Sequence, residues 1–302
     1  VGINTGMDFG AVGVEGVGND IAAPTIFGGR VYWKPIHGVY DAAVGISSIT
    51  DINPGVDLPS EEDATDTMQT AAYYGNPVFL NLAADLDLPF IETDFLSIVG
   101  FADIAGSLPY FRTSNSALNI TEGFALGVLW NDQSSDSIPF RNYGITAGLF
   151  GNILMLDWRL AYRDYNGIFR PSFYNSSYER KRGEYVRELA AYMSDRNAPQ
   201  YNTRTVGIYG EGGFSFTDLF SAELAYMWPW TPGATAEENL ETPDFFSFTA
   251  VLEPGLIPVV DVHGSISYER TGFVQTLADE STETGLFDAN TVLSGEVIYP
   301  VA

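Results

Sequence analysis

The chain has 302 residues, with 39 acidic and 14 basic side chains that give a formal net charge of -25. So acidic a chain lacks the basic surface that a phosphate backbone requires, which excludes nucleic acid as a partner. It has no cysteine, which excludes disulfide bonds and thiolate ligands, and its 45% of hydrophobic residues excludes a disordered chain.

Long strands with one apolar and one polar face are predicted along the whole chain, because apolar and polar residues alternate with period two. In the clearest run, 78–90, every even position is apolar and the odd positions include Asn81, Asp85 and Asp87. At about 3.3 Å per residue this run spans roughly 40 Å, enough for a tilted strand to cross a bilayer. In chain order the predicted strands are 3–14, 27–33, 40–48, 78–90, 96–104, 124–130, 143–149, 154–162, 206–216, 220–228, 246–252, 260–268 and 292–301.

Short and long connections are expected to alternate, because consecutive hairpins of a barrel lie on opposite rims. The predicted short turns are 34–38, 89–94, 151–152, 217–218 and 253–258, and the predicted long loops are 50–75, 166–202, 231–243 and 271–284. The alternation fails between residues 95 and 151, so the predicted strands either omit one strand near 108–120 or include one that does not exist there. Single-chain bacterial barrels have even strand numbers, which makes about 14 strands the estimate.

The predicted fold is all-β: an antiparallel transmembrane β-barrel over residues 1–302, as a single domain with one partly helical long loop. No apolar run reaches the roughly 18 residues of a membrane-spanning helix, so a membrane crossing would use strands. A soluble β-sandwich or repeat array is the alternative, but its strands average only about 5 or 6 residues. Aromatic residues near the strand ends suit the girdles of a membrane barrel: Trp33, Trp130, Trp158, Tyr162, Tyr226, Trp228, Trp230, Tyr268 and Tyr299.

The ends of the chain predict a processed or truncated protein. The sequence begins at Val1 without a start methionine, as expected after removal of a targeting segment or in a fragment. It ends at Ala302, just after a predicted strand and without a terminal aromatic residue.

With these strands, aromatic rims, short turns and acidic loops, the chain resembles the bacterial outer-membrane β-barrel porins. The resemblance is architectural, covers nearly the whole length and rests on no motif of one named family. The style of the turns and loops is similar to barrel proteins of diderm bacteria such as spirochaetes. The resemblance implies a place in the bacterial cell outer membrane, passive transport, and outer-membrane lipid as a partner. Fold analogy alone names no solute.

Carboxylates dominate the face of the strands that would line a barrel lumen. Rings of carboxylate favour cations, because a low-dielectric wall focuses their field. In the alternative interpretation these acids are solvated or paired with neighbouring strands. The predicted lining bases are Arg30, Lys34, Arg159 and Arg163. The predicted pore-lining acids are Asp41, Asp85, Asp87, Asp103, Asp157, Glu211, Glu223, Asp261 and Glu269, with Glu253 and Glu296 as further members.

Nine of the 14 basic residues lie between positions 159 and 204, in and beside the loop 166–202. Ser177 is a candidate cap of a short helix over 178–193, whose apolar stripe holds Tyr178, Tyr185, Leu189 and Tyr192. We expect this loop to fold into the mouth or lumen and pack against the acidic wall as a constriction or plug. The alternative is an external loop whose helix is solvated or packs on a partner subunit. The predicted constriction residues are Arg170, Arg180, Lys181, Arg182 and Arg187.

No enzyme, cofactor or metal site is predicted. His263 shares a strand face with Asp261 and Ser265, but residues two apart are about 7 Å apart, too far for a direct proton relay. His37 lies in a predicted tight turn. The acidic loop clusters lack the glycine-bearing spacing of a calcium-binding EF-hand: Glu61, Glu62, Asp63 and Asp66; Glu237, Glu238 and Glu241; Asp279, Glu280 and Glu283.

Two function classes follow from the sequence. The first is an outer-membrane porin-like channel for passive diffusion of small hydrophilic solutes, cationic or neutral. The second is a structural or surface-anchoring barrel that acts through partner contacts at its loops or rims. The partner in that case is another copy of the chain or another envelope protein. Water access distinguishes the two, because a channel needs a continuous path and an anchor does not.

Overall fold

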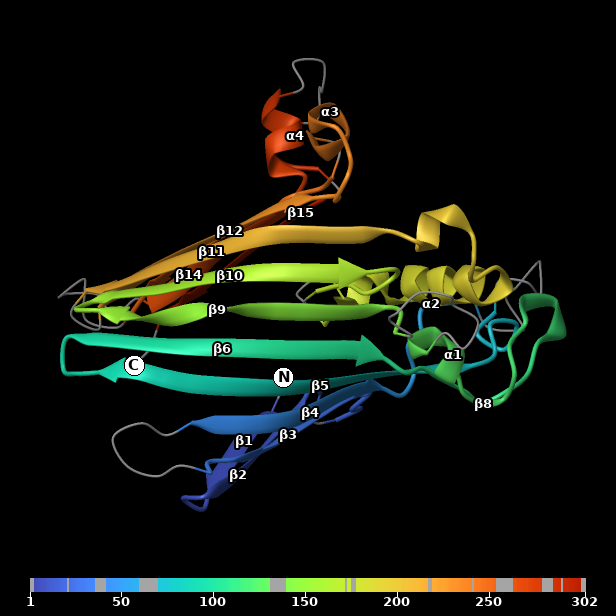
Figure 1. The fold of residues 1–302 in the computed structure, drawn as a ribbon, viewed down its shortest axis with the longest axis horizontal. Helices are drawn as coiled ribbons and strands as arrows, with labels where there is room; N and C mark the ends of the chain where they lie inside the picture. Colours follow the sequence, from blue (N-terminus) through green and yellow to red (C-terminus); the bar gives the residue numbers. More distant parts are fainter. Residues whose placement is uncertain are drawn as a thin grey trace. The chain divides into compact units, whose positions relative to one another are not determined.

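The computed structural model describes residues 3–20, 22–35, 42–59, 70–130, 140–171, 173–174, 178–216, 219–240, 242–253, 263–278, 285–288 and 290–299. These residues form an antiparallel sheet of 15 strands with few helices, which confirms the predicted all-β class (Figure 1). In this part of the chain, no helix has the length and hydrophobicity that crossing a bilayer requires.

The strands follow the chain from the blue N-terminal end to the red C-terminal end in Figure 1. They are β1 (Ile3–Asp8), β2 (Val12–Gly18), β3 (Ile26–Trp33), β4 (Ala43–Asp51), β5 (Pro77–Glu92), β6 (Leu96–Ser107), β7 (Tyr110–Phe111), β8 (Gly123–Phe124), β9 (Tyr143–Ile153), β10 (Leu156–Asn166), β11 (Arg204–Phe216), β12 (Phe220–Trp230), β13 (Phe245–Leu252), β14 (His263–Thr271) and β15 (Thr291–Ile298). The α-helices are α1 (Leu126–Leu129), α2 (Tyr178–Ser194), α3 (Ala236–Leu240) and α4 (Phe273–Ala278).

The sheet is a meander in which each strand pairs with its neighbours in the chain, from β1 to β6 and then from β9 to β15. This path holds 13 of the 15 strands, because β7 and β8 lie off it. Strand β6 pairs directly with β9, so the whole stretch between them is one long connection. The expected alternation of short and long connections is therefore kept across the region where the sequence pattern broke it.

The predicted strand over 124–130 is wrong. The structure has β8 and α1 there, and the amide of Ala125 bonds to the carbonyl of Pro109. Val128 is fully buried in a cluster of loop side chains, so its apolar character serves that cluster and not a sheet face. A period-two pattern over seven residues does not distinguish these two environments.

The predicted single strand over 3–14 is also wrong, because it is the hairpin of β1 and β2. Gly10 adopts φ +84°, a conformation that glycine reaches without steric cost, and its amide bonds to Asp8 Oδ1 at 2.7 Å. The amide of Phe9 bonds to the carbonyl of Val12 and closes the turn. The strand predicted over 124–130 is absent from the path, and the hairpin of β1 and β2 adds one strand. The path therefore still has 13 strands, as many as were predicted.

The chain divides into two compact units, and each is described here by itself. Unit 1 contains Val1–Asp87, Ala102–Ile145 and Tyr165–Arg204, and unit 2 contains Leu88–Phe101, Thr146–Asp164 and Thr205–Ala302.

In unit 1, the two faces of the sheet differ in polarity. Val14, Val31 and Ile46 lie in one row across β2, β3 and β4, and all three are exposed, Ile46 to 68%. The next row, on the opposite face, contains Glu15 and Arg30. Side chains of successive residues point to opposite faces of a strand, so one face is apolar and the other is charged.

In unit 2, the same separation recurs. Leu224, Phe248, Tyr268 and Leu293 form a row across β12, β13, β14 and β15, with Leu293 57% exposed. The row beside it, on the other face, is polar and contains Glu223, Thr249, Ser267 and Ser294. In each unit, neighbouring strands thus leave large apolar side chains exposed on one face of the sheet.

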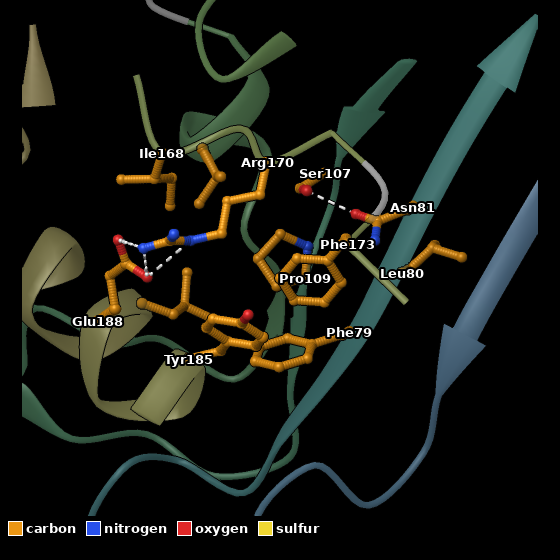
Figure 2. Close-up of a pocket in the computed structure, with 12 residues that line it drawn as sticks. Phe79, Leu80, Asn81, Ser107, Pro109, Ile168, Arg170, Phe173, Tyr185 and Glu188 are labelled. Atoms are coloured by element: carbon orange, nitrogen blue, oxygen red, sulfur yellow. Dashed lines mark hydrogen bonds and ion pairs between the residues drawn. The ribbon is translucent and has the colours of Figure 1, made fainter. Parts of the chain in front are cut away.

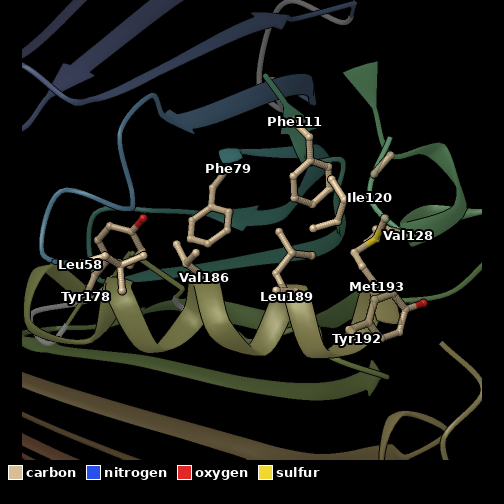
Figure 3. Close-up of a cluster of buried hydrophobic side chains, with 12 residues drawn as sticks. Leu58, Phe79, Phe111, Ile120, Val128, Tyr178, Val186, Leu189, Tyr192 and Met193 are labelled. Carbon is tan, nitrogen blue, oxygen red and sulfur yellow. The ribbon is translucent and has the colours of Figure 1, made fainter. Parts of the chain in front are cut away.

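The buried hydrophobic cluster of unit 1 lies among loops, one end of β5 and helix α2, which confirms the predicted helix (Figure 3). Val186 and Leu189 of α2 point toward Phe79 and Phe111. The predicted stripe is buried or partly buried, whereas the predicted cap Ser177 lies outside the described residues. The cluster contains Leu58, Phe79, Phe111, Ile120, Ala125, Val128, Tyr178, Val186, Leu189, Ala190, Tyr192 and Met193.

Replacing Gly148 of β9 with alanine is expected to weaken the sheet of unit 2. A Cβ atom at Gly148 would lie 2.2 Å from the carbonyl oxygen of Leu160 and 2.7 Å from the Cα of Ala161, both backbone atoms of β10. Overpacking of this kind costs about 1–3 kcal/mol. The urea midpoint of unfolding of the purified protein measures the loss. Gly210→Ala is the matched control, because a Cβ at Gly210 meets nothing within 4 Å; equal midpoints for the two variants would contradict the clash.

Candidate functional site

The polar face of unit 1 is organised around Arg30 of β3. The guanidinium forms an ion pair with Asp85 of β5, in which Nε donates to Oδ1 at 3.1 Å, and lies 3.6 Å from Glu15 and 3.8 Å from Asp87. One arginine therefore partly neutralises the charge of three carboxylates from two other strands. This part of the predicted acidic lining keeps a net negative charge but is partly compensated.

A second ion pair on this unit joins Lys34 to Asp8, with 2.7 Å between Nζ and Oδ2. The hydroxyl of Tyr32 donates to the same carboxylate at 3.2 Å. Two of the four predicted lining bases, Arg30 and Lys34, thus form ion pairs with acids that lie two strands away in the sheet.

Helix α2 packs against the polar face of unit 1 at one end of β5. Phe79, which contacts α2, is an odd-numbered residue of β5 and so shares a face with Asn81 and Asp85. The hydroxyl of Tyr178, at the start of α2, donates to Asp51 at 2.7 Å. Burial raises the pKa of this hydroxyl far above its ordinary value, so Tyr178 remains a donor.

Apolar contacts, and not charge attraction, carry most of this packing. Arg182 pairs with Asp57 in the loop after β4, at 2.6 Å between Nε and Oδ2, and Arg170 pairs with Glu188 on α2 itself. The direct partners of these two side chains are therefore a loop acid and a helix acid, and Arg182 is also attracted to Asp51 at the end of β4. Arg180 and Arg187 are exposed on the helix and Lys181 is partly buried.

A small cavity lies between the polar face of unit 1 and α2 (Figure 2). Phe79, Phe173 and Tyr185 form its aromatic wall, with ring centroids of Phe79 and Phe173 5.5 Å apart and those of Phe173 and Tyr185 4.9 Å apart. The Arg170–Glu188 pair closes one side. At about 40 Å³ it has room for a few water molecules and not for a solute.

The polar face of unit 2 has a different arrangement, in which arginines lie over aromatic rings. The Cζ of Arg163 lies 3.6 Å from the ring centroid of Tyr209, and the Cζ of Arg159 lies 4.9 Å from that of Phe101 and 5.4 Å from that of Phe150. These strand positions share the face opposite the exposed Leu156, Leu160 and Tyr162 on β10.

Three predicted lining acids lie close to these arginines. Glu211 accepts a hydrogen bond from the hydroxyl of Tyr209 at 2.7 Å. Asp157, Glu211 and Arg159 are all within electrostatic range of Glu223. The structure therefore brings together Arg159, Arg163, Asp157, Glu211 and Glu223, from β10, β11 and β12.

The remaining predicted lining acids divide into three groups. Asp103 and Glu269 are described and each has an interaction partner. Glu253 and Glu296 are described and exposed. Asp41 and Asp261 lie outside the described residues. Phe150 was missed as a member of the polar-face cluster; it directly follows the predicted strand 143–149, so extending that strand by one residue would have included it.

Among the described residues, no group of three or more His, Asp or Glu side chains is placed to hold a metal ion. The clusters at 61–66 and 279–283 fall outside them, as does His37. Glu238 has a structural role, because it forms a capping box at the start of α3: its carboxylate accepts from the amide of Thr235 at 2.7 Å and its amide donates to Thr235 Oγ1 at 3.2 Å.

A scan against protein-family models and a search of curated proteins both find no match for this chain. The functional argument therefore depends on the two faces of the sheet. One face exposes large apolar side chains, and the other carries acids, arginines and aromatic rings.

Proposed function

We propose that this chain forms the wall of a β-barrel in a bacterial outer membrane and acts as a channel for small hydrophilic solutes, with a preference for cations. One observation carries the proposal: in each unit, neighbouring strands expose large apolar side chains on one face and charged ones on the other. Exposed apolar area costs about 25 cal/mol per Å² in water, and a bilayer removes that cost. The opposite face would then line a water-filled lumen.

Closure of the sheet is part of the proposal. Among the described residues, the pairing path ends at β1 on one side and β15 on the other. Backbone groups in hydrocarbon must all be hydrogen-bonded, so a membrane-embedded sheet needs these edges joined. The 13 strands of the path plus one more would give 14, an even number as in single-chain bacterial barrels.

The preference for cations follows from the charge of the polar face. The chain has 39 acids against 14 bases, and carboxylates of both units occupy this face. A low-dielectric wall strengthens their field in the lumen, which attracts cations and repels anions.

An anchoring function is the second candidate, and helix α2 favours it. The helix covers one end of the polar face of β5 through Phe79 and is fixed by buried contacts. A lumen filled by α2 would make the protein a membrane anchor whose loops bind a second copy or another envelope protein.

Ion conductance in planar bilayers tests the proposal. Under a potassium chloride gradient, we expect stable current steps and a reversal potential of cation-selective sign. Glu223→Gln should move the reversal potential toward zero because it removes a lining charge, whereas Glu122→Gln, at an exposed loop position, should leave it unchanged. Stable insertion without current would favour the anchor, and a protein that stays soluble and monomeric without detergent would contradict both functions.

A further inference from the structure

Arg159 and Arg163 stand out because their guanidinium groups are unused as hydrogen-bond donors. In the part of the chain that the structure describes, neither forms a hydrogen bond or an ion pair; each lies over aromatic rings. Four other arginines form ion pairs with carboxylates: Arg30 with Asp85, Arg170 with Glu188, Arg182 with Asp57 and Arg270 with Asp288.

The aromatic rings hold these guanidinium groups in place. The Cζ of Arg163 lies 3.6 Å from the ring centroid of Tyr209. The Cζ of Arg159 lies beside the pair of Phe101 and Phe150, 4.9 Å from one ring centroid and 5.4 Å from the other, and these two centroids are 5.7 Å apart. Stacking fixes the plane of a guanidinium and leaves its fork of N–H donors free at the edge. A carboxylate is the group that this fork matches, through two parallel hydrogen bonds.

Opposite charge lies near Arg159 without touching it. Asp157 is two residues away on the same face of β10, about 7 Å along the strand, and Glu223 is within electrostatic range. Glu211 is held by Tyr209 through its hydroxyl. Among the described residues, none of these acids comes within 4.0 Å of the Arg159 guanidinium as an ion pair, so the cation and the acids lie near one another without a direct bond.

We propose that this cluster is a binding site for small zwitterions that carry a carboxylate and an ammonium group, as free amino acids do. The guanidinium of Arg159 binds the solute carboxylate, and Asp157 and Glu223 bind the ammonium group. Arg163 lies four residues along β10, about 13 Å away, which is too far to bind the same carboxylate. It provides a second carboxylate-binding group further along the strand. The inference rests on the proposed channel and names its solute class.

Solute block of single-channel current tests the site. Four probes of similar size separate the chemistries: L-alanine carries both charges, lactate only the carboxylate, isopropylammonium only the cation, and lactamide neither. We expect L-alanine to reduce potassium chloride current at about one-tenth the concentration that lactamide needs, because a charge-assisted pair of bonds is worth a factor of about ten or more. Lactate should be intermediate.

Variants assign the effect to Arg159. Arg159→Gln should raise the half-blocking concentration of L-alanine about tenfold and bring it close to that of lactamide. Arg159→Lys should recover only part of the effect, because an ammonium lacks the planar fork. Arg112→Gln, which removes an exposed arginine bonded to the carbonyl of Ile52, should change nothing.

The outcomes separate this inference from the channel itself. Current without preference for L-alanine, or a preference that survives Arg159→Gln, overturns the zwitterion site and leaves the channel standing. If the protein carries no current, equilibrium dialysis of radiolabelled L-alanine against the detergent-solubilised protein and its Arg159→Gln variant decides. Arg159-dependent binding then supports the site, and its absence overturns it.

Discussion

Replacing Val186 with aspartate is expected to release helix α2 from unit 1 and, in a conducting barrel, to raise single-channel conductance. Val186 is 1% exposed and faces Phe79 within the buried cluster, so the variant buries a carboxylate with no partner. An unpaired buried charge costs several kcal/mol, and the helix avoids that cost by undocking. Trypsin detects the release, because Arg180, Lys181, Arg182 and Arg187 all lie within α2.

Ala191→Asp is the matched control for Val186→Asp. It introduces the same side chain on the same helix at an exposed position, so trypsin resistance and conductance should stay as in the unchanged protein. Equal cleavage of the two variants would show that α2 is not held by its buried face. If trypsin cleaves Val186→Asp but its conductance does not rise, the result supports docking of α2 by its buried face and contradicts a constriction by α2.

Replacing Arg270 with methionine is expected to free the connection that contains α4. Arg270 is 1% exposed, and its guanidinium bonds to Asp288 at 2.9 and 3.1 Å and to Thr276 and Thr291 at 2.6 Å. Breaking a buried pair by removing one partner costs about 3–5 kcal/mol. Limited chymotrypsin digestion measures the release, because Phe273 and Leu277 lie in α4.

A double variant and a change of pH separate the ion pair from general damage. Arg270→Met with Asp288→Leu should recover most of the resistance, since an apolar pair can replace a buried ionic one. The guanidinium of Arg270 lowers the pKa of Asp288 below its usual value. The contribution of the pair is therefore complete above the unfolded-state pKa and is lost as the pH falls through the folded-state pKa. Resistance of the single variant equal to that of Arg112→Met would contradict the structural role of Arg270.

Most strands could be predicted because the signal for them is local. Alternation of period two reports which side chains share a face, and β5, β10 and β12 carry it over ten or more residues. The errors arose where the run was short or glycine-rich. In 124–130, apolar residues serve a loop cluster, and in 3–14 the turn at Gly10 interrupts what looked like one strand.

The candidate site could be predicted only in part, because it depends on pairing across distant strands. The sequence placed Arg159, Arg163, Asp157, Glu211 and Glu223 on one face. That Arg159 lies over Phe101 and Phe150, 58 and nine positions earlier in the chain, follows from the strand order β6–β9–β10, which no local pattern encodes. The helix α2 was likewise predictable from its stripe, but its partner Phe79 was not.

The position of the buried cluster has a consequence for how this protein can vary between species. Side chains such as Ile46 and Leu293 on the exposed apolar face would meet fluid acyl chains, which adapt to any shape, so hydrophobicity alone constrains them. The side chains around Val186 and Phe111 meet other protein atoms at close packing, where a change of one methyl group is felt. Homologous sequences should therefore exchange Leu, Ile, Val and Phe freely along the outer rows, while the loop cluster under α2 changes only through paired substitutions that conserve volume.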